Sequence, residues 1–349
     1  MKIWSTILVL VVTAVTQAAN SPESVRVASP RLQLATKLQI RDVNLDKTIE
    51  PKLINRLKEQ DDRADHPIDA KNFIQWFSDF SFLEKNRKEK LDVYIPSGEW
   101  KANRPAVLFI HGGGFKIGDK AEYRSASVCA DLARAGYVAV SCNYILSTKE
   151  KPGVWPQNIA DCREAVRWMR QNARDLGIDP QRIAVAGGSA GGYLALMVGL
   201  TDEKPELGGN PNATISSKVS AVIDMYGVTS SEKHGKDTLV NLGADTAKLF
   251  SPLSYVTSKS VPVLILHGTA DKTVDIKESK NLEEVLIKNK VDYNFVEIEE
   301  AEHTFDLHPS KGKGWKLTGA FKGQIESRKS IEPDVKAVVI EFLERTIGK

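Results

Sequence analysis

Cysteine is scarce in this sequence, and metal-ligand patterns are absent from it. The 349 residues include three cysteines, Cys129, Cys142 and Cys162. So small and odd a number excludes a disulfide framework of the kind that staples small secreted domains, although one bridge among the three remains open. Each cysteine stands in an apolar context, which favours a buried thiol. No run of residues has the spacing of a metal site, so we expect no bound metal.

An excess of either charge is lacking as well. The sequence holds 48 lysines and arginines against 45 aspartates and glutamates, for a formal net charge of +3. This balance argues against nucleic acid or an anionic membrane surface as a partner of the whole chain. After the first 19 residues no stretch is long and apolar enough for a membrane helix, so we expect no membrane span.

The first residues have the three-part layout of a secretory signal peptide. Lys2 precedes an apolar run at residues 7–12, and small residues follow at 16–19. The apolar run is too short to span a bilayer. The sequence therefore predicts a signal peptide over residues 1–19 and a mature protein exported to the periplasm or the extracellular space. A buried N-terminal strand is the alternative interpretation.

Residues 20–77 are expected to form a linker and a short helical lead-in. Two stretches, 42–49 and 61–69, have the outline of calcium-binding EF-hand loops, and helical runs follow both, the second at residues 70–77. The glycine and glutamate positions that such loops need are occupied by other residues, namely Lys47, His66, Leu53 and Asn72. We therefore expect a degenerate pair that binds no calcium at physiological concentration. A solvated, charged helical segment explains the same residues.

From residue 78 to 349, apolar runs of strand length alternate with amphipathic segments of helix length. Strands are predicted at residues 80–82, 91–95, 107–110, 137–141, 183–186, 219–226, 261–267 and 293–298. Helices are predicted at residues 122–135, 158–176, 193–198, 277–288 and 335–347. Such alternation is typical of an α/β domain with a mostly parallel central sheet and helices on both faces. Ligands of these sheets bind beyond the carboxyl ends of the strands.

One turn stands out between the predicted strand at 183–186 and the predicted helix at 193–198. It contains Gly187-x-Ser189-x-Gly191, a single serine among residues with almost no side chain. A strand-to-helix turn this tight strains the backbone of its central residue, and the flanking glycines relieve the crowding. The pattern and its context match the G-x-S-x-G nucleophile elbow. Taken alone, the glycines would also suit a phosphate cradle or a plain tight loop.

A serine becomes a nucleophile at neutral pH only with a base and with an acid that orients the base. Downstream of the elbow, Asp271 follows directly on a predicted strand and is the preferred acid. Asp275, four residues later, is the second candidate, with helix capping as its alternative role. Among the six histidines, His303 is the preferred base because it lies just past the last predicted strand. The order serine, acid, histidine is the one this architecture uses.

Donors for an oxyanion are predicted from a second glycine-rich turn. His111 and three glycines follow directly on the predicted strand at 107–110. Consecutive glycines let the backbone turn its N–H groups toward a bound carbonyl oxygen. We assign Gly113 and Gly114 as donors from this loop and the N–H of Ala190, the residue after the serine, as a third.

Six motifs together give the sequence a family likeness: HGGGF (111–115), WPQNIADCREAVRWMR (155–170), GIDPQRIAVAGGSAGG (177–192), SPLSYV (251–256), HGTAD (267–271) and EHTF (302–305). From about residue 80 to 349 the sequence resembles an α/β-hydrolase esterase of the HGGG-bearing, hormone-sensitive-lipase-like group. It is most similar there to exported bacterial esterases associated with acetyl or feruloyl groups on plant polysaccharides. The resemblance implies an α/β-hydrolase fold and hydrolysis of carboxylic esters through an acyl-serine intermediate, without metal or organic cofactor.

Two departures from the family pattern bear on the substrate. No large insertion separates residues 226 and 251, so we expect no large cap domain and an open site. Residues 311–329 form a basic, glycine-containing excursion, expected to be a solvated loop, with a carbohydrate-facing or polyanion-facing role as the alternative. The expected substrate is a small-molecule or polysaccharide ester. An amide hydrolase with the same triad and a non-catalytic secreted binding protein on the same scaffold are the alternative functions.

Overall fold

The computed structural model describes residues 74–96, 101–151, 153–230, 248–305, 317–321, 324–328 and 335–349. The predicted signal peptide and the EF-hand-like pair lie outside these residues, so both stay predictions. The same holds for part of the segment between residues 226 and 251, where we expect no large cap.

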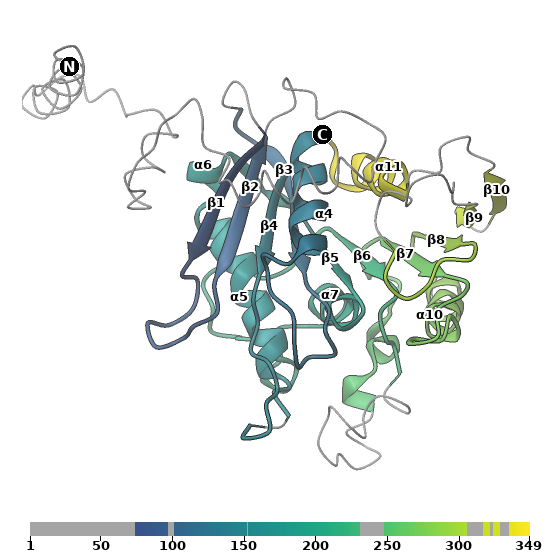
Figure 1. Ribbon diagram of the computed structural model, residues 1–349, viewed down its shortest axis with the longest axis horizontal. Coiled ribbons are helices and arrows are strands. Elements are labelled where there is room, and N and C mark those ends of the chain that lie inside the picture. The colour runs from purple at the N-terminus through teal and green to yellow at the C-terminus, as the bar shows by residue number, and fades with distance from the viewer. Residues whose placement is uncertain are drawn as a thin grey trace, which may run out of the picture. The chain divides into compact units, whose positions relative to one another are not determined.

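A ten-stranded sheet organises the described residues (Figure 1). Its strands are β1 (Ile74–Phe80), β2 (Leu91–Pro96), β3 (Arg104–Ile110), β4 (Val138–Cys142), β5 (Ile178–Gly188), β6 (Ala221–Met225), β7 (Val263–Gly268), β8 (Tyr293–Ile298), β9 (Leu317–Phe321) and β10 (Gln324–Arg328). Their order across the sheet is β1-β2-β4-β3-β5-β6-β7-β8-β9-β10. The neighbours from β4 to β8 pair in parallel, and the strands at both ends pair antiparallel. The mostly parallel sheet predicted from the sequence is confirmed.

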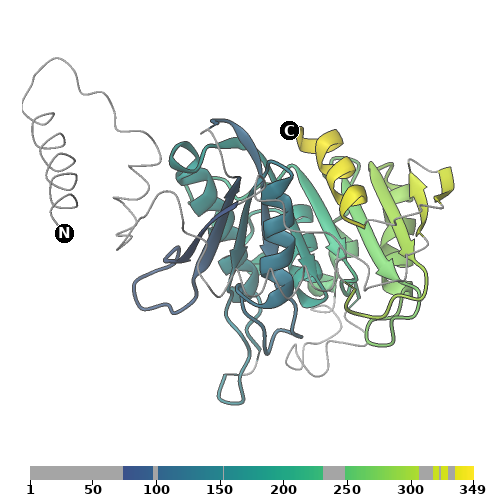
Figure 2. The ribbon, with the colours of Figure 1, turned by 45° about the horizontal axis from the view of Figure 1, so that its top comes forward.

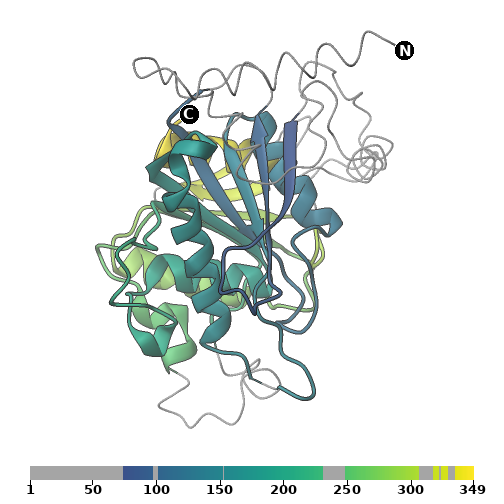
Figure 3. The same cartoon turned by 90° about the vertical axis from the view of Figure 1, so that its left-hand side faces the viewer.

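Helices cover both faces of this sheet. They are α4 (Tyr123–Arg134), α5 (Gln157–Gln171), α6 (Ala173–Leu176), α7 (Ala190–Leu200), α10 (Lys277–Lys288) and α11 (Val335–Ile347), with short 3-10 turns η2 (Pro205–Leu207) and η3 (Pro252–Tyr255). In Figure 2, α4 and the yellow α11 lie in front of the strands. Figure 3 shows the blue α4 and the teal α5 on opposite sides of the sheet. Among the described residues, no helix is long and apolar enough to cross a membrane.

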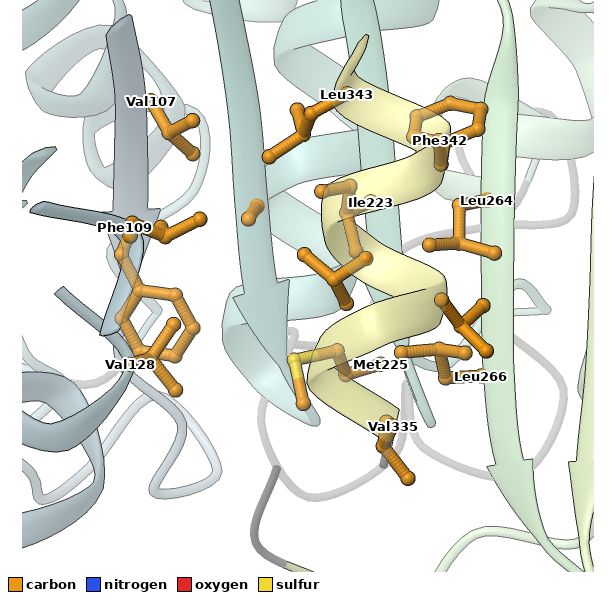
Figure 4. Close-up of a cluster of buried hydrophobic side chains, with 14 of the residues drawn as sticks. Val107, Phe109, Val128, Ile223, Met225, Leu264, Leu266, Val335, Phe342 and Leu343 are labelled. Atoms are coloured by element: carbon orange, nitrogen blue, oxygen red, sulfur yellow. The ribbon is translucent and has the colours of Figure 1, made fainter. Parts of the chain in front are cut away.

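The core on one face is built where α11 crosses the middle of the sheet. Figure 4 shows side chains of α11 pointing toward those of β6 and β7. These buried residues are Val335, Phe342, Leu343, Ile223, Met225, Leu264 and Leu266. Full burial of one such side chain is worth about 1.5–3 kcal/mol. The parallel ladders hold β6 and β7 beside β5, and so set the relative positions of the loops that follow these strands.

The N-terminal edge of the sheet corrects two predictions. β1 begins at Ile74, so residues 74–77 form a strand and not the end of the helical run predicted at 70–77. The sheet also begins before residue 78, where we placed the start of the domain. β1 pairs antiparallel with β2, and Trp76 stacks on Tyr94 with ring centroids 6.2 Å apart. The partner strand, which lies elsewhere in the sequence, decides the structure of these residues.

The C-terminal edge of the sheet corrects a third prediction. The excursion at residues 311–329, expected to be a solvated loop, contains β9 and β10. β9 pairs with β8, and β10 pairs with β9, so these strands extend the sheet. The excursion is therefore in large part an antiparallel hairpin, formed because β8 offers an unpaired edge.

The predicted helix at 158–176 is interrupted. α5 ends at Gln171, and α6 begins at Ala173 after Asn172, whose side-chain amide donates to the carbonyl of Trp168 at 2.8 Å. Asparagine competes in this way with the backbone bonds of a helix. Gly177 ends α6 with φ 70°, the left-handed conformation that a helix C-cap favours.

The three cysteines are free and buried. Cys142 ends β4, and Cys162 lies on α5. Burial raises the pKa of the Cys129 and Cys162 thiols, so both stay protonated and unreactive at neutral pH.

Candidate active site

Ser189 occupies the tight turn between β5 and α7, as predicted. Its backbone has φ 57° and ψ −120°, a conformation that is strained for a residue with a side chain. A Cβ on Gly187 would overlap the carbonyl of Gly191, so only glycine fits there. The Ser189 N–H donates to the carbonyl of Met225 at 2.8 Å, which fastens the turn to the end of β6. The serine is thereby held at the carboxyl edge of the sheet and at the N-terminus of α7.

Hydrogen bonds join the three residues predicted to form the triad. Ser189 Oγ lies 2.9 Å from His303 Nε2, and His303 Nδ1 lies 2.7 Å from Asp271 Oδ2. A carboxylate can only accept, so the imidazole proton sits on Nδ1, and Nε2 is left to accept the serine O–H. The three side chains follow β5, β7 and β8. Parallel strands place these distant residues together because their carboxyl ends meet at one edge of the sheet.

The two candidate acids have different surroundings. The Asp271 side chain is fully buried, and that of His303 is 16% exposed. Asp271 Oδ1 accepts from the N–H groups of Thr273 at 2.8 Å and Val274 at 2.9 Å, which leaves Oδ2 for His303. Asp275 Oδ1 instead accepts from the N–H of Lys277, the first residue of α10, at 3.0 Å. Asp271 is thus the carboxylate that meets the histidine, and Asp275 is a cap.

The glycine turn after β3 passes directly beside the elbow. A Cβ on Gly112 would lie 3.4 Å from Ser189 Cβ. Gly113 has φ 101°, and Gly114 has φ 58°, which turn this backbone out of the strand direction. The Gly113 carbonyl accepts from the N–H of Ile117 at 3.1 Å, so it is turned toward the residues that follow it in the loop. Ala190 is the first residue of α7, and N–H groups in a first helical turn have no intrahelical acceptor.

A buried aromatic pair supports this glycine turn. The Tyr144 hydroxyl donates to the carbonyls of His111 at 3.1 Å and Gly112 at 3.2 Å. The two rings stack with centroids 4.4 Å apart. Burial lowers the pKa of His111, so its ring is neutral, and its Nδ1–H donates to the Gly112 carbonyl at 2.8 Å. His111 therefore shapes the loop.

Two residues at the site had no role in the sequence prediction. Tyr226 was expected only to end a strand, yet its ring packs on His303. His267 belongs to the HGTAD motif but was assigned only to a strand end, and its ring contacts Asp271. The motif itself was the available signal for His267. For Tyr226 the sequence offers none, because the contact joins loops from different strands.

Known esterases resemble this chain over much of its length. The family model described as BD-FAE matches residues 91–286, more than half of the chain. Esterase LipQ of Mycobacterium tuberculosis (strain ATCC 25618 / H37Rv) is 29% identical over 247 residues, which cover 66% of this chain and 57% of that protein. The chain thus spans little more than half the length of the curated relatives that it matches.

Solved structures share the fold. The propionate-bound esterase Est2 of the Planctomycetes species Thermogutta terrifontis gives a TM-score of 0.58 at 27% identity, covering 80% of this chain and 94% of that one. A truncated carbohydrate esterase from gut microbiota gives a TM-score of 0.57 at 24% identity, covering 67% and 91%. The stretch matched by the family model runs from β2 into α10 and takes in both the elbow and the Asp271 turn. The chain therefore belongs to the BD-FAE family, and its fold is that of an α/β-hydrolase.

Proposed function

We propose that the protein is a carboxylic-ester hydrolase that works through an acyl-serine intermediate. The observation that carries the proposal is the continuous hydrogen-bonded chain from Ser189 through His303 to Asp271. It lies beside a glycine turn suited to binding an oxyanion. Relatives named as esterases support the same reaction class.

The mechanism follows from the positions of these groups. Ser189 Oγ attacks the ester carbonyl carbon while His303 Nε2 takes the hydroxyl proton. Asp271 keeps the other imidazole proton on Nδ1 and stabilises the imidazolium that forms. The N–H groups of Gly113, Gly114 and Ala190 bind the oxyanion of the tetrahedral intermediate. His303 then gives its proton to the leaving alcohol, and a water molecule, activated by the same histidine, releases the acid from Ser189.

The proposed substrate is a carbohydrate carrying a short acyl or hydroxycinnamoyl group. Structures of Est2 with bound propionate and with bound butyrate support a short acyl group, since both ligands are short carboxylic acids. The carbohydrate as the alcohol half follows the resemblance of residues 80–349 as a whole to exported bacterial polysaccharide esterases. We also infer that the protein is exported, on the strength of the signal-peptide layout of residues 1–19.

A panel of substrates tests the proposal. Purified mature protein is assayed on p-nitrophenyl acetate, propionate, butyrate and octanoate, on acetylated and feruloylated xylan fragments, and on the matching anilides. We expect hydrolysis of short esters, and a rate several orders of magnitude lower for Ser189→Ala, which keeps only oxyanion binding and substrate positioning. Equal ester turnover by folded Ser189→Ala and wild type would remove the proposal. Faster anilide than ester hydrolysis would favour the amide-hydrolase alternative.

A further inference from the structure

His267, the penultimate residue of β7, lies beside the Asp271 carboxylate. Its side chain is fully buried. Nε2 lies 3.0 Å from the carbonyl of Val274 and 3.2 Å from Asp271 Oδ2. On the other side of the ring, Nδ1 lies 2.7 Å from the hydroxyl of Ser279 on α10. The imidazole therefore joins a sheet strand, the turn that carries the acid and a helix.

The neighbours fix the tautomer of this ring. A carbonyl only accepts, so the Val274 contact places the proton on His267 Nε2. The Ser279 hydroxyl then donates to Nδ1. Burial lowers the pKa of His267, which keeps the ring neutral. The charged or titratable groups that act on it are Asp271 and His303. A neutral ring adds no competing cation beside the carboxylate.

The peptide groups of Val274 tie His267 to the acid. The Val274 N–H donates to Asp271 Oδ1 at 2.9 Å, and the Val274 carbonyl accepts from His267. Val274 thus binds one oxygen of the Asp271 carboxylate with its N–H and is itself bound by His267 through its carbonyl. If the His267 N–H is lost, the Val274 carbonyl loses this donor. Neither the turn nor the orientation of the Asp271 carboxylate is then held in place by it.

We propose that His267 is a positioning residue for the acid: its Nε2–H, donated to the Val274 carbonyl, locks the 271–274 turn, and its Nε2 edge lies beside the carboxylate oxygen that His303 uses. The inference rests on the proposed roles of Asp271 and His303. Oδ2 then has two N–H groups near it, from His303 at 2.7 Å and from His267 at 3.2 Å. The partial positive charge of the His267 N–H, at this distance, moderates the pull of the oxygen on the His303 proton. Ser279 acts through His267, because its O–H donates to Nδ1 and so excludes the tautomer that carries the proton on Nδ1.

Three variants separate positioning from packing. His267→Leu removes the donor, and we expect kcat to fall by up to roughly 100-fold with KM unchanged, the effect of a displacement of about 1 Å at a reacting group. The acid limb of the pH profile of kcat/KM should move to higher pH, because Asp271 then attracts the His303 proton more strongly. His267→Gln keeps an N–H donor at the Nε2 position and should restore most of kcat. Ser279→Ala should shift the acid limb in the same direction by less.

Leu282→Ala is the matched control, since Leu282 is a buried apolar residue on α10 three positions from Ser279. It should lower the melting temperature and leave kcat per folded molecule and the acid limb at their wild-type values. The inference is overturned if His267→Leu behaves like this control. Failure of the wild type to hydrolyse any ester would count against the proposed function and not against this inference.

A measurement that needs no activity decides the tautomer. Histidine-selective ¹⁵N labelling of the whole protein, with assignment by His267→Gln, reports which nitrogen of His267 carries the proton. We expect the Nε2–H form at neutral pH. A proton on Nδ1, or on both nitrogens, at that pH would contradict the proposed position of the donor whatever the enzyme hydrolyses.

Discussion

The ring of Tyr226 stands edge-on to the imidazole of His303, with centroids 5.0 Å apart and ring planes at 60°. Tyr226 is buried and also meets Phe305, at a centroid distance of 4.9 Å. It follows β6, and its N–H donates to the carbonyl of Leu266 at 2.8 Å, so the ring is fixed to the sheet. The fixed Tyr226 ring therefore limits rotation of the His303 imidazole, which has to contact Ser189 and Asp271 at the same time.

Truncation of the Tyr226 side chain should lower kcat, because the His303 imidazole would no longer be held in position. We expect Tyr226→Ala to reduce kcat by up to roughly 100-fold, the effect of a displacement of about 1 Å at a reacting group. Tyr226→Phe keeps the ring and should retain most of kcat. The comparison uses kcat at equal folded concentration, because loss of a buried aromatic side chain also destabilises by about 3–5 kcal/mol. Equal losses in the two variants would assign the effect to the hydroxyl.

The two candidate acids give a second prediction. Asp271→Asn keeps the shape but favours the wrong tautomer of His303, so kcat should fall roughly 10³–10⁴-fold. Asp275→Asn changes only a cap of α10 and should reduce the free energy of unfolding by about 1 kcal/mol or less. Its kcat should stay close to wild type. The two variants are compared at equal folded concentration on one short acyl ester, and an inactive Asp275→Asn beside an active Asp271→Asn would exchange the two roles.

The glycines of the oxyanion loop differ in what they tolerate. A Cβ on Gly113 would overlap the carbonyl of Ile117, and its φ of 101° is unfavourable for any L side chain. A Cβ on Gly114 meets nothing within 4 Å, and its φ of 58° is an ordinary left-handed value. Gly113→Ala should therefore displace the loop and lower kcat roughly 10²–10³-fold, the loss expected for one oxyanion donor.

Gly114→Ala is the comparison for this loop, since alanine keeps the N–H that we assign to the oxyanion and adopts the left-handed conformation at a cost of about 1–2 kcal/mol. Its kcat should stay near wild type while its melting temperature falls. Measurement of kcat and melting temperature for both variants separates strain from loss of the donor. A greater loss of kcat in Gly114→Ala would show that Gly113 is not the residue that shapes the site.

Much of the candidate site could be predicted from the sequence because its chemistry is confined to short motifs at strand ends. Ser189, Asp271 and His303 each follow a strand of the parallel part of the sheet, whose carboxyl ends meet at one edge. Once the alternation of strands and helices is recognised, residues 114 positions apart, such as Ser189 and His303, are expected to meet. The strained turn at Ser189 was also predictable, since only small neighbours allow it.

The parts that were missed depend on contacts with other segments of the chain. β1 and β9 are antiparallel additions at the sheet edges, and their hydrogen bonds come from β2 and β8. Their own residues carry a weak apolar pattern, so a local prediction gave helix for one and loop for the other. The ring of Tyr226 meets His303 only because the loops after β6 and β8 converge. Such a contact leaves no mark in the spacing of residues along the chain.

A buried acid under the elbow leads to the last prediction. Asp224 lies in β6 and is fully buried, with Oδ1 accepting from the Gly227 N–H at 3.0 Å. Among the described residues, Oδ2 has no hydrogen-bond partner. Desolvation by burial, with a smaller effect from the charge of Glu278, raises the pKa of Asp224 from 3.8 to about 7. The carboxyl therefore stays protonated in the folded protein over a range in which the unfolded chain loses this proton.

The sign of the pH dependence follows from this difference in proton binding. Below about pH 4 both states carry the proton, and above about pH 7 neither does. Between these values the folded state binds more protons, so Asp224 lowers the free energy of unfolding as pH rises, by at most about 1.4 kcal/mol per unit. Asp224→Asn matches the protonated acid in shape and does not titrate. In urea unfolding at pH 5 and pH 8, the variant should exceed wild type in stability at both pH values, and by more at pH 8. Parallel curves for the two proteins across this range would mean that Asp224 ionises at an ordinary acid pH and that its buried oxygen finds a partner when charged.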